Sequence, residues 1–145
     1  MSYHARSCLL IHCVFATKNR MPTIPENMQS RLWAYLGGIA RTNGMKALAV
    51  GGVADHAHAL LSLPATIALA KAIQLLKSGS SKWMHEQTSS RRFDWQEGYG
   101  AFSIGASQVA ATIRYIENQP RHHKKISAEE EWEIFLRRHA DFLGD

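Results

Sequence analysis

The hydrophobic and polar positions along this chain predict four strand regions. Residues 8–17 (CLLIHCVFAT) form a continuous apolar run rich in β-formers, which is typical of a central strand. A short strand over residues 46–50 is expected to turn at Gly51-Gly52 into a strand over residues 55–63. The last strand region covers residues 91–96 and 99–104, bent around Gly98 and Gly100.

Apolar residues at helical spacing predict four helices between and after these strands. The first lies between Pro25 and Gly44, and the second covers residues 66–86. The third, capped by Ser103 or Ser107, stops at Gln119 because Pro120 disfavours helix at the residue before it. In the fourth helix, Ser127 and Glu130 form a capping box.

This order of elements, β-α-β-β-α-β followed by two helices, predicts an α+β fold. We expect a ferredoxin-like sandwich, in which helices cover one face of an antiparallel sheet and the other face is free for a ligand. The 145 residues suggest one domain over residues 1–145, and the hydrophobic fraction of 46% suffices for a core.

The composition of the chain indicates its cellular location and the kind of partner it binds. No apolar run approaches the roughly 20 residues of a membrane span, and the N-terminus lacks a signal-peptide pattern. Cys8 and Cys13 are the only cysteines, and we interpret both as buried thiols. These features predict a cytoplasmic protein without a membrane partner. The net charge of +5 suggests a polyanionic partner.

Two histidines two residues apart are the first candidate chemistry. Successive side chains of a strand point to opposite faces, so His56 and His58 share one face and Ala57 and Ala59 the other. Two imidazoles placed in this way could converge on one cation, although two solvated histidines explain the pattern equally well. His12 either lines the same surface or is hydrogen-bonded inside the sheet.

A tyrosine on the third helix is the second candidate. Tyr115 lies outside the apolar stripe, with Gln119 one turn later on the same polar face. Such a tyrosine is usually a half-exposed aromatic, but here Gln119 would reach whatever Tyr115 reaches. The basic residues 121–125 that follow are interpreted as a solvated linker.

Basic residues near strand ends and aromatic side chains are the candidate DNA contacts. They are Lys18, Arg20, Lys77, Arg91 and Arg92. The nearby aromatic residues would either stack on bases or fill the core, and we assign at least two of them to the core; they are Phe93, Trp95, Tyr99 and Phe102.

Several of these segments resemble one known family. Residues 55–58 (DHAH) are similar to the His-hydrophobe-His motif of the HUH endonucleases, and residues 114–119 (RYIENQ) to the tyrosine helix of the single-tyrosine transposases. These enzymes mobilise the smallest bacterial insertion sequences. Further similarity covers residues 12–20, 76–81 and 95–103, so that the resemblance extends over about residues 10–143.

The resemblance implies a mechanism. His56, His58 and Gln119 would hold one divalent metal, Mg²⁺ or Mn²⁺, and Tyr115 would attack single-stranded DNA to form a 5′-phosphotyrosine. The covalent bond conserves the phosphodiester energy, so no nucleotide cofactor is needed. The family also implies a homodimer and a substrate with hairpins at the element ends.

Two alternatives remain. A non-catalytic, domesticated module on the same fold would bind single-stranded nucleic acid but would leave the two histidines, Tyr115 and Gln119 unexplained together. A zinc-dependent hydrolase using His56 and His58 would need a third ligand and would make Tyr115 dispensable. We favour the transposase.

Overall fold

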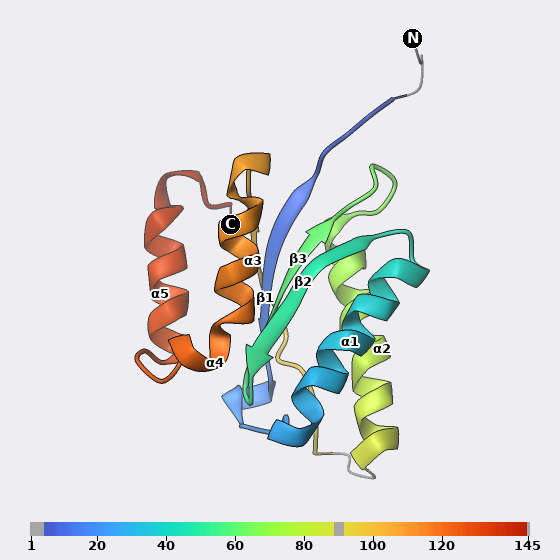
Figure 1. Ribbon diagram of the computed structural model, residues 1–145, viewed down its shortest axis with the longest axis vertical. Helices are drawn as coiled ribbons and strands as arrows, with labels where there is room; N and C mark the ends of the chain where they lie inside the picture. Colours follow the sequence, from blue (N-terminus) through green and yellow to red (C-terminus); the bar gives the residue numbers. More distant parts are fainter. Residues whose placement is uncertain (1–4, 89–91, 145) are drawn as a thin grey trace.

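The computed structural model describes residues 5–88 and 92–144, and it contains the predicted ferredoxin-like fold (Figure 1). Four strands form one antiparallel sheet in the order β2-β3-β1-β4. They are β1 (Leu10–Ala16), β2 (Lys46–Val53), β3 (His56–Ser62) and β4 (Gly100–Ser103). The histidine strand therefore lies inside the sheet, between β2 and β1.

Helices α1 (Glu26–Thr42) and α2 (Leu69–Thr88) cover one face of the sheet, where they enclose the main core. The small side chains of Ala57 and Ala59 on β3 are buried in this core together with Leu61. Phe93 and Trp95 join the same core, and Phe102 is buried as well, which confirms the assignment of at least two aromatics to the core. Tyr99 is 40% exposed.

The opposite face of the sheet is not free, which corrects our prediction. Helices α3 (Val109–Glu117), α4 (Gln119–His122) and α5 (Ala128–Arg138) lie on this side of the sheet (Figure 1). The apolar stripe of α3 explains why: Ile116 is completely buried against Leu60 of β3 and Ala49 of β2. The polar face of the sheet is therefore enclosed by the C-terminal third of the chain.

The predicted turn at Gly51-Gly52 is also wrong, because β2 continues through both glycines and turns at Ala54 and Asp55. Gly51 lies beneath α3. A Cβ atom there would be 2.4 Å from the backbone oxygen of Ile116, so only glycine permits this approach of helix to strand. The glycine pair marks a helix contact rather than a turn.

Helix boundaries near the tyrosine differ from the prediction as well. Neither Ser103 nor Ser107 caps α3: Ser103 belongs to β4, and Ser107 lies in a 3-10 turn (Ala106–Gln108) that precedes the helix. Helix α3 ends at Glu117, and α4 begins at Gln119, because Pro120 is tolerated in a first helical turn. In α5, Ser127 Oγ accepts a hydrogen bond from the Glu130 backbone N–H, which confirms that cap.

Three smaller predictions can be scored. Arg91 lies outside the described residues, and of the described residues 92–104 only Gly100–Ser103 form a strand, although Trp95 makes an isolated bridge to Thr17. Cys13 is buried as predicted, whereas Cys8 is exposed. Among the residues that the structure describes, no helix is long and apolar enough to cross a membrane.

Candidate metal and tyrosine site

His56 and His58 project from β3 towards the face that α3–α5 enclose. Both imidazoles are almost fully buried, with exposed fractions of 2% and 0%. Both imidazoles lie close to Glu131 of α5, a carboxylate that we did not predict. His58 Nε2 donates a hydrogen bond of 2.8 Å to Glu131 Oε1, and His56 Nε2 lies 3.5 Å from the same oxygen.

Glu131 is the centre of the whole cluster. It is only 3% exposed, and its second oxygen, Oε2, lies 3.1 Å from His122 Nε2 and 3.2 Å from His123 Nε2. The side-chain amide of Gln119 donates to Oε2 at 3.2 Å, and the hydroxyl of Tyr115 donates to it in a short hydrogen bond. A buried carboxylate is stable only with such partners.

The predicted site residues therefore lie close together in the structure. Gln119, which is fully buried, places its Oε1 3.1 Å from His56 Nε2. The Tyr115 ring makes edge contacts with the rings of His12 and His58. His12 lines the same surface as the histidine pair and is also hydrogen-bonded inside the sheet, because its Nε2 lies 2.8 Å from His58 Nδ1.

Our interpretation of residues 121–125 as a solvated linker is wrong for two of the five. His122 and His123 turn towards Glu131, and the side chain of His123 is only 8% exposed. The remaining three, Arg121, Lys124 and Lys125, are exposed.

Charge in the cluster is shared unevenly. Burial by itself would raise the pKa of Glu131, but the surrounding imidazoles hold it well below its usual range. Burial would lower the pKa of His56, but hydrogen bonds to Asp55 and Glu131 outweigh this and raise it to about 9. Burial lowers the pKa of His58 to about 4 and that of His12 to about 3. Of these three imidazoles, His56 is therefore the one that carries a positive charge near neutral pH, next to the Glu131 carboxylate.

Tyr115 is held as a neutral phenol in this arrangement. Its burial, its hydrogen bond to Glu131 and the negative charge of that carboxylate all raise the pKa of Tyr115 above its ordinary value. A phenol in this state is a weak nucleophile.

The donor atoms of the cluster suit a divalent metal. One ligand atom from each of His56, His58, His123 and Glu131 can be chosen so that all lie within 4.8 Å of one another. His123 Nε2 is buried, has no hydrogen-bond partner among the described residues, and is one of these four ligand atoms. Imidazole nitrogens and oxygens are common ligands of transition metals and zinc.

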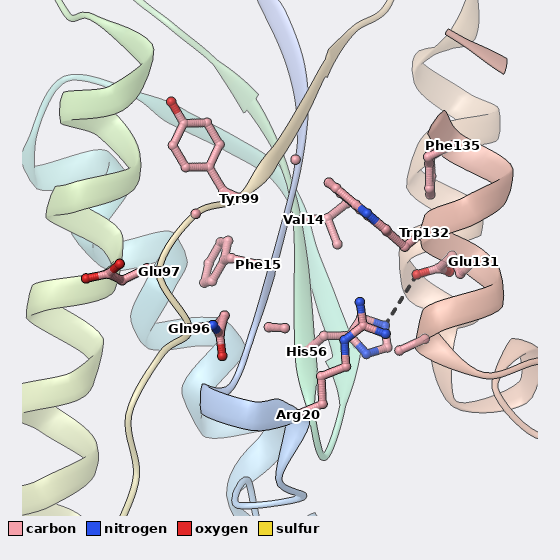
Figure 2. Close-up of a pocket in the computed structure, with 14 residues that line it drawn as sticks. Val14, Phe15, Arg20, His56, Gln96, Glu97, Tyr99, Glu131, Trp132 and Phe135 are labelled. Atoms are coloured by element: carbon pink, nitrogen blue, oxygen red, sulfur yellow. Dashed lines mark ion pairs between the residues drawn. The ribbon is translucent and has the colours of Figure 1, made fainter. Parts of the chain in front are cut away.

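A cavity of about 360 Å³ opens beside this cluster, with His56 and Glu131 in its wall (Figure 2). Figure 2 shows the segment with Gln96 and Tyr99 on one side and α5 with Trp132 and Phe135 on the other. Arg20 lines the cavity near His56 and is exposed. The cavity therefore connects the cluster with solvent and carries one cation at its rim.

The predicted DNA contacts are distributed unevenly around this cavity. Lys18 and Arg20 lie in a 3-10 turn after β1 and are exposed. Lys77 is engaged within the chain, because its Nζ donates to the backbone oxygens of Gln96 at 2.7 Å and Gly98 at 2.6 Å. Arg92 is exposed, and Arg91 lies outside the described residues.

The sequence of this chain was compared with known protein families. Residues 5–119 match the family described as IS200-like transposases. The chain belongs to this family. The match covers the histidine strand and the tyrosine helix but ends before His123 and Glu131.

Individual members of the family agree with this assignment. The chain is 26% identical over 122 residues to the transposases for insertion sequence element IS200 of Salmonella typhimurium and Salmonella typhi, covering 80% of this chain and of each relative. A solved structure of a putative transposase from Deinococcus radiodurans has a TM-score of 0.65 at 23% identity, covering 82% of this chain and 96% of that one. A REP-associated tyrosine transposase bound to a REP hairpin has a TM-score of 0.61 at 14% identity, covering 87% and 76%. The two structures share the fold.

Sequence reasoning missed Glu131, His122, His123 and Asp55. Glu131 is one of three consecutive glutamates at the start of α5, and nothing in that run marks the central one. The adjacent His122-His123 pair was a usable signal, because two imidazoles soon after the tyrosine helix could reach the same metal as His56 and His58.

Proposed function

We propose that this transposase cleaves and rejoins single-stranded DNA through a covalent bond between Tyr115 and a 5′ phosphate. The observation that carries the proposal is the convergence of Tyr115 with His56 and His58 on one carboxylate, although they come from α3 and β3. A buried structural tyrosine would need no set of metal-binding side chains around its hydroxyl group.

In this reaction the protein positions the hydroxyl oxygen of Tyr115 for attack on a phosphate. The Tyr115 oxygen forms a bond to phosphorus while the bond from phosphorus to the 3′ oxygen breaks. The phenol releases a proton and the departing 3′ oxygen takes one up, so the step is balanced and needs no nucleotide cofactor. The free 3′-OH can later reverse the step on another strand.

A divalent metal, Mg²⁺ or Mn²⁺, fits the site that His56, His58 and Gln119 would provide. When bound, it supplies Lewis-acid polarisation of the scissile phosphate. The second ring nitrogen of each histidine is already positioned, since His56 Nδ1 donates to Asp55 Oδ1 at 2.8 Å and His58 Nδ1 pairs with His12. Such outer partners hold metal-binding imidazoles in place.

Single-stranded DNA with a hairpin is the proposed substrate. The REP-associated relative is bound to a REP hairpin, which supports a hairpin partner here. Arg20 at the cavity rim and Lys18 in the same 3-10 turn would contact the phosphates, with Arg91, Arg92 and Lys77 as further candidates, and binding should weaken with salt. We also propose a homodimer, in a cytoplasmic setting, by analogy with the family, with residues 1–145 as one functional domain.

The proposal is tested with single-stranded oligonucleotides tiled across the DNA that flanks this gene. Wild-type protein with Mn²⁺ should give a protein–DNA adduct on a denaturing gel, and EDTA should abolish it. Tyr115→Phe should lose the adduct completely but keep DNA binding, because it removes only the nucleophilic oxygen. The matched control is Tyr35→Phe, whose ring stacks on Trp83 far from the cluster and should change nothing.

An adduct of undiminished yield in Tyr115→Phe would exclude Tyr115 as the nucleophile. Tight binding of a hairpin by the wild-type protein without any adduct would favour the domesticated binding module instead.

A further inference from the structure

We propose that His123 and Glu131 complete a second, closed ligand set with His56 and His58, that this set prefers Zn²⁺, and that it holds α5 over the site in an inactive state. The inference rests on the proposed function, because it concerns the regulation of the same metal site. Both added residues lie beyond residues 5–119, the part of the chain that matches the family.

The first support is the direction of the ring nitrogens. His123 Nδ1 donates a hydrogen bond of 2.8 Å to the backbone oxygen of Ile126, which fixes the ring with its Nε2 towards Glu131. That Nε2 is buried, faces Glu131 Oε2 at 3.2 Å, and has no hydrogen-bond partner among the described residues. A buried imidazole nitrogen without a hydrogen-bond partner, next to a buried carboxylate, favours a cation that both groups can bind.

The same arrangement occurs at the other two imidazoles. His56 Nδ1 is bound by Asp55, and His58 Nδ1 by His12, so all three histidines turn Nε2 towards Glu131. Metal-binding histidines characteristically engage their outer nitrogen in this way, with a carboxylate, a backbone carbonyl or another polar group. Three oriented Nε2 atoms and one carboxylate oxygen therefore provide four donors from β3, the segment after α4, and α5.

The chemistry of this set differs from that of the proposed catalytic set. Three imidazoles and one carboxylate suit Zn²⁺, and four protein ligands leave no open position, as in structural zinc sites. His56, His58 and Gln119 are only three ligands and leave positions for phosphate oxygens. Gln119 is not one of the four donors of the closed set; its amide donates to Glu131 Oε2 instead.

Closure also disables the nucleophile. The hydroxyl of Tyr115 donates to Glu131 Oε2, so the carboxylate that would bind Zn²⁺ through one oxygen holds the phenol with the other. A scissile phosphate can reach Tyr115 only when Glu131 leaves. Because Glu131 belongs to α5, its departure loosens the packing of Phe135 of that helix against Phe102 of β4.

The test uses the full-length, chelator-treated protein and the metal alone. Zn²⁺ affinity is measured by competition with a chromophoric chelator, and bound Co²⁺ by its visible absorption, which is intense in four-coordinate sites and weak in six-coordinate ones. The wild-type protein should bind Zn²⁺ with an intense Co²⁺ spectrum. Glu131→Gln and His123→Gln should each lose at least tenfold in Zn²⁺ affinity and should weaken the Co²⁺ spectrum.

Glu129→Gln is the matched control, because Glu129 lies on the same first turn of α5 but is exposed. It should keep the wild-type Zn²⁺ affinity. Circular dichroism establishes that each variant is folded, and two ligand variants on different segments prevent one misfolded protein from deciding the result.

Unchanged Zn²⁺ affinity in both Glu131→Gln and His123→Gln would overturn the proposal. If His56→Ala alone lost Zn²⁺ affinity, the metal would instead be bound by the set of His56, His58 and Gln119. A second readout separates this failure from failure of the proposed function. With Mn²⁺ present, Zn²⁺ should suppress the Tyr115 adduct of the wild-type protein, and equal adduct yield with and without bound Zn²⁺ would show that the closed set does not regulate cleavage. Absence of any Mn²⁺-dependent adduct would instead count against the transposase chemistry, while the metal-binding result would stand.

Discussion

The two faces of β3 show how one strand serves two different purposes. On one face, Ala57, Ala59 and Leu61 pack against α1 and α2, and the contacts are apolar. On the other face, His56 and His58 contact α3–α5, and most of the contacts are hydrogen bonds and ion pairs. The packing of the first face is stabilised by the burial of apolar surface. The packing of the second face is stabilised by a few hydrogen bonds and ion pairs with residues distant in sequence. Substitutions on the apolar face should therefore mainly lower the free energy of unfolding, and substitutions on the polar face should mainly change activity.

The largest effect is expected from the apolar face. Leu61→Ala removes a fully buried side chain from the main core and should lower the free energy of unfolding by about 2–5 kcal/mol. Urea unfolding measures this change. Adduct formation at low temperature should survive in the fraction that remains folded, and an unchanged urea midpoint would show that this face does not dominate stability.

A matched pair of glycines sharpens the comparison. Gly51→Ala would place a Cβ atom 2.4 Å from the backbone oxygen of Ile116, so α3 must move and Tyr115 with it. We expect a destabilisation of about 1–3 kcal/mol, as for other overpacked sites, and a loss of adduct yield in the protein that stays folded.

Gly37→Ala is the counterpart on the helix side. Its Cβ would be 4.0 Å from Ala47, an ordinary contact, and alanine in a helix should stabilise by about 0.5–1 kcal/mol. Adduct yield should not change. Equal yields from the two variants would contradict the role of Gly51 in positioning the tyrosine helix.

The dependence of stability on pH, measured on metal-free protein in chelator, tests the polar face of β3. The raised pKa of His56, about 9, means that its stabilising contribution is complete below about pH 6.5 and is lost as the pH rises through 9. One such group changes stability by at most about 1.4 kcal/mol per pH unit. The lowered pKa values of His12 and His58 act in the other direction and reduce stability as the pH falls below 6.5.

Urea midpoints between pH 5 and 9 check this prediction. Stability should be greatest between these limits, and the loss on the alkaline side should disappear in His56→Gln. A wild-type midpoint that rises steadily up to pH 9 would show that His56 is not held as an imidazolium.

The comparison of the two faces also explains what the sequence could predict. The order of elements follows from local periodicity, and so does the placement of His56 and His58 on a shared face. Tyr115 and Gln119 were found because they deviate from an apolar stripe. Glu131 was not, because three glutamates in a first helical turn look alike until the long-range packing of α5 selects one.

Gly51 shows the same limit for the backbone. Two glycines after a short strand usually mark a turn, and only the approach of Ile116 from 65 residues later in the chain reveals that they mark a helix contact. Local pattern predicts elements, whereas contacts between distant elements decide how the polar face is closed.

The most direct test of the account is to locate the nucleotide on the protein. The adduct formed with a reactive single-stranded oligonucleotide and Mn²⁺ would be trimmed with nuclease, digested and analysed by mass spectrometry. The chain contains four tyrosines, and Tyr99 lines the same cavity as His56, so the assignment is not trivial. We predict that the nucleotide is attached to Tyr115 through a 5′ phosphate. Attachment to Tyr99, or to any other residue, would contradict the central claim that α3 and β3 together form the cleavage site.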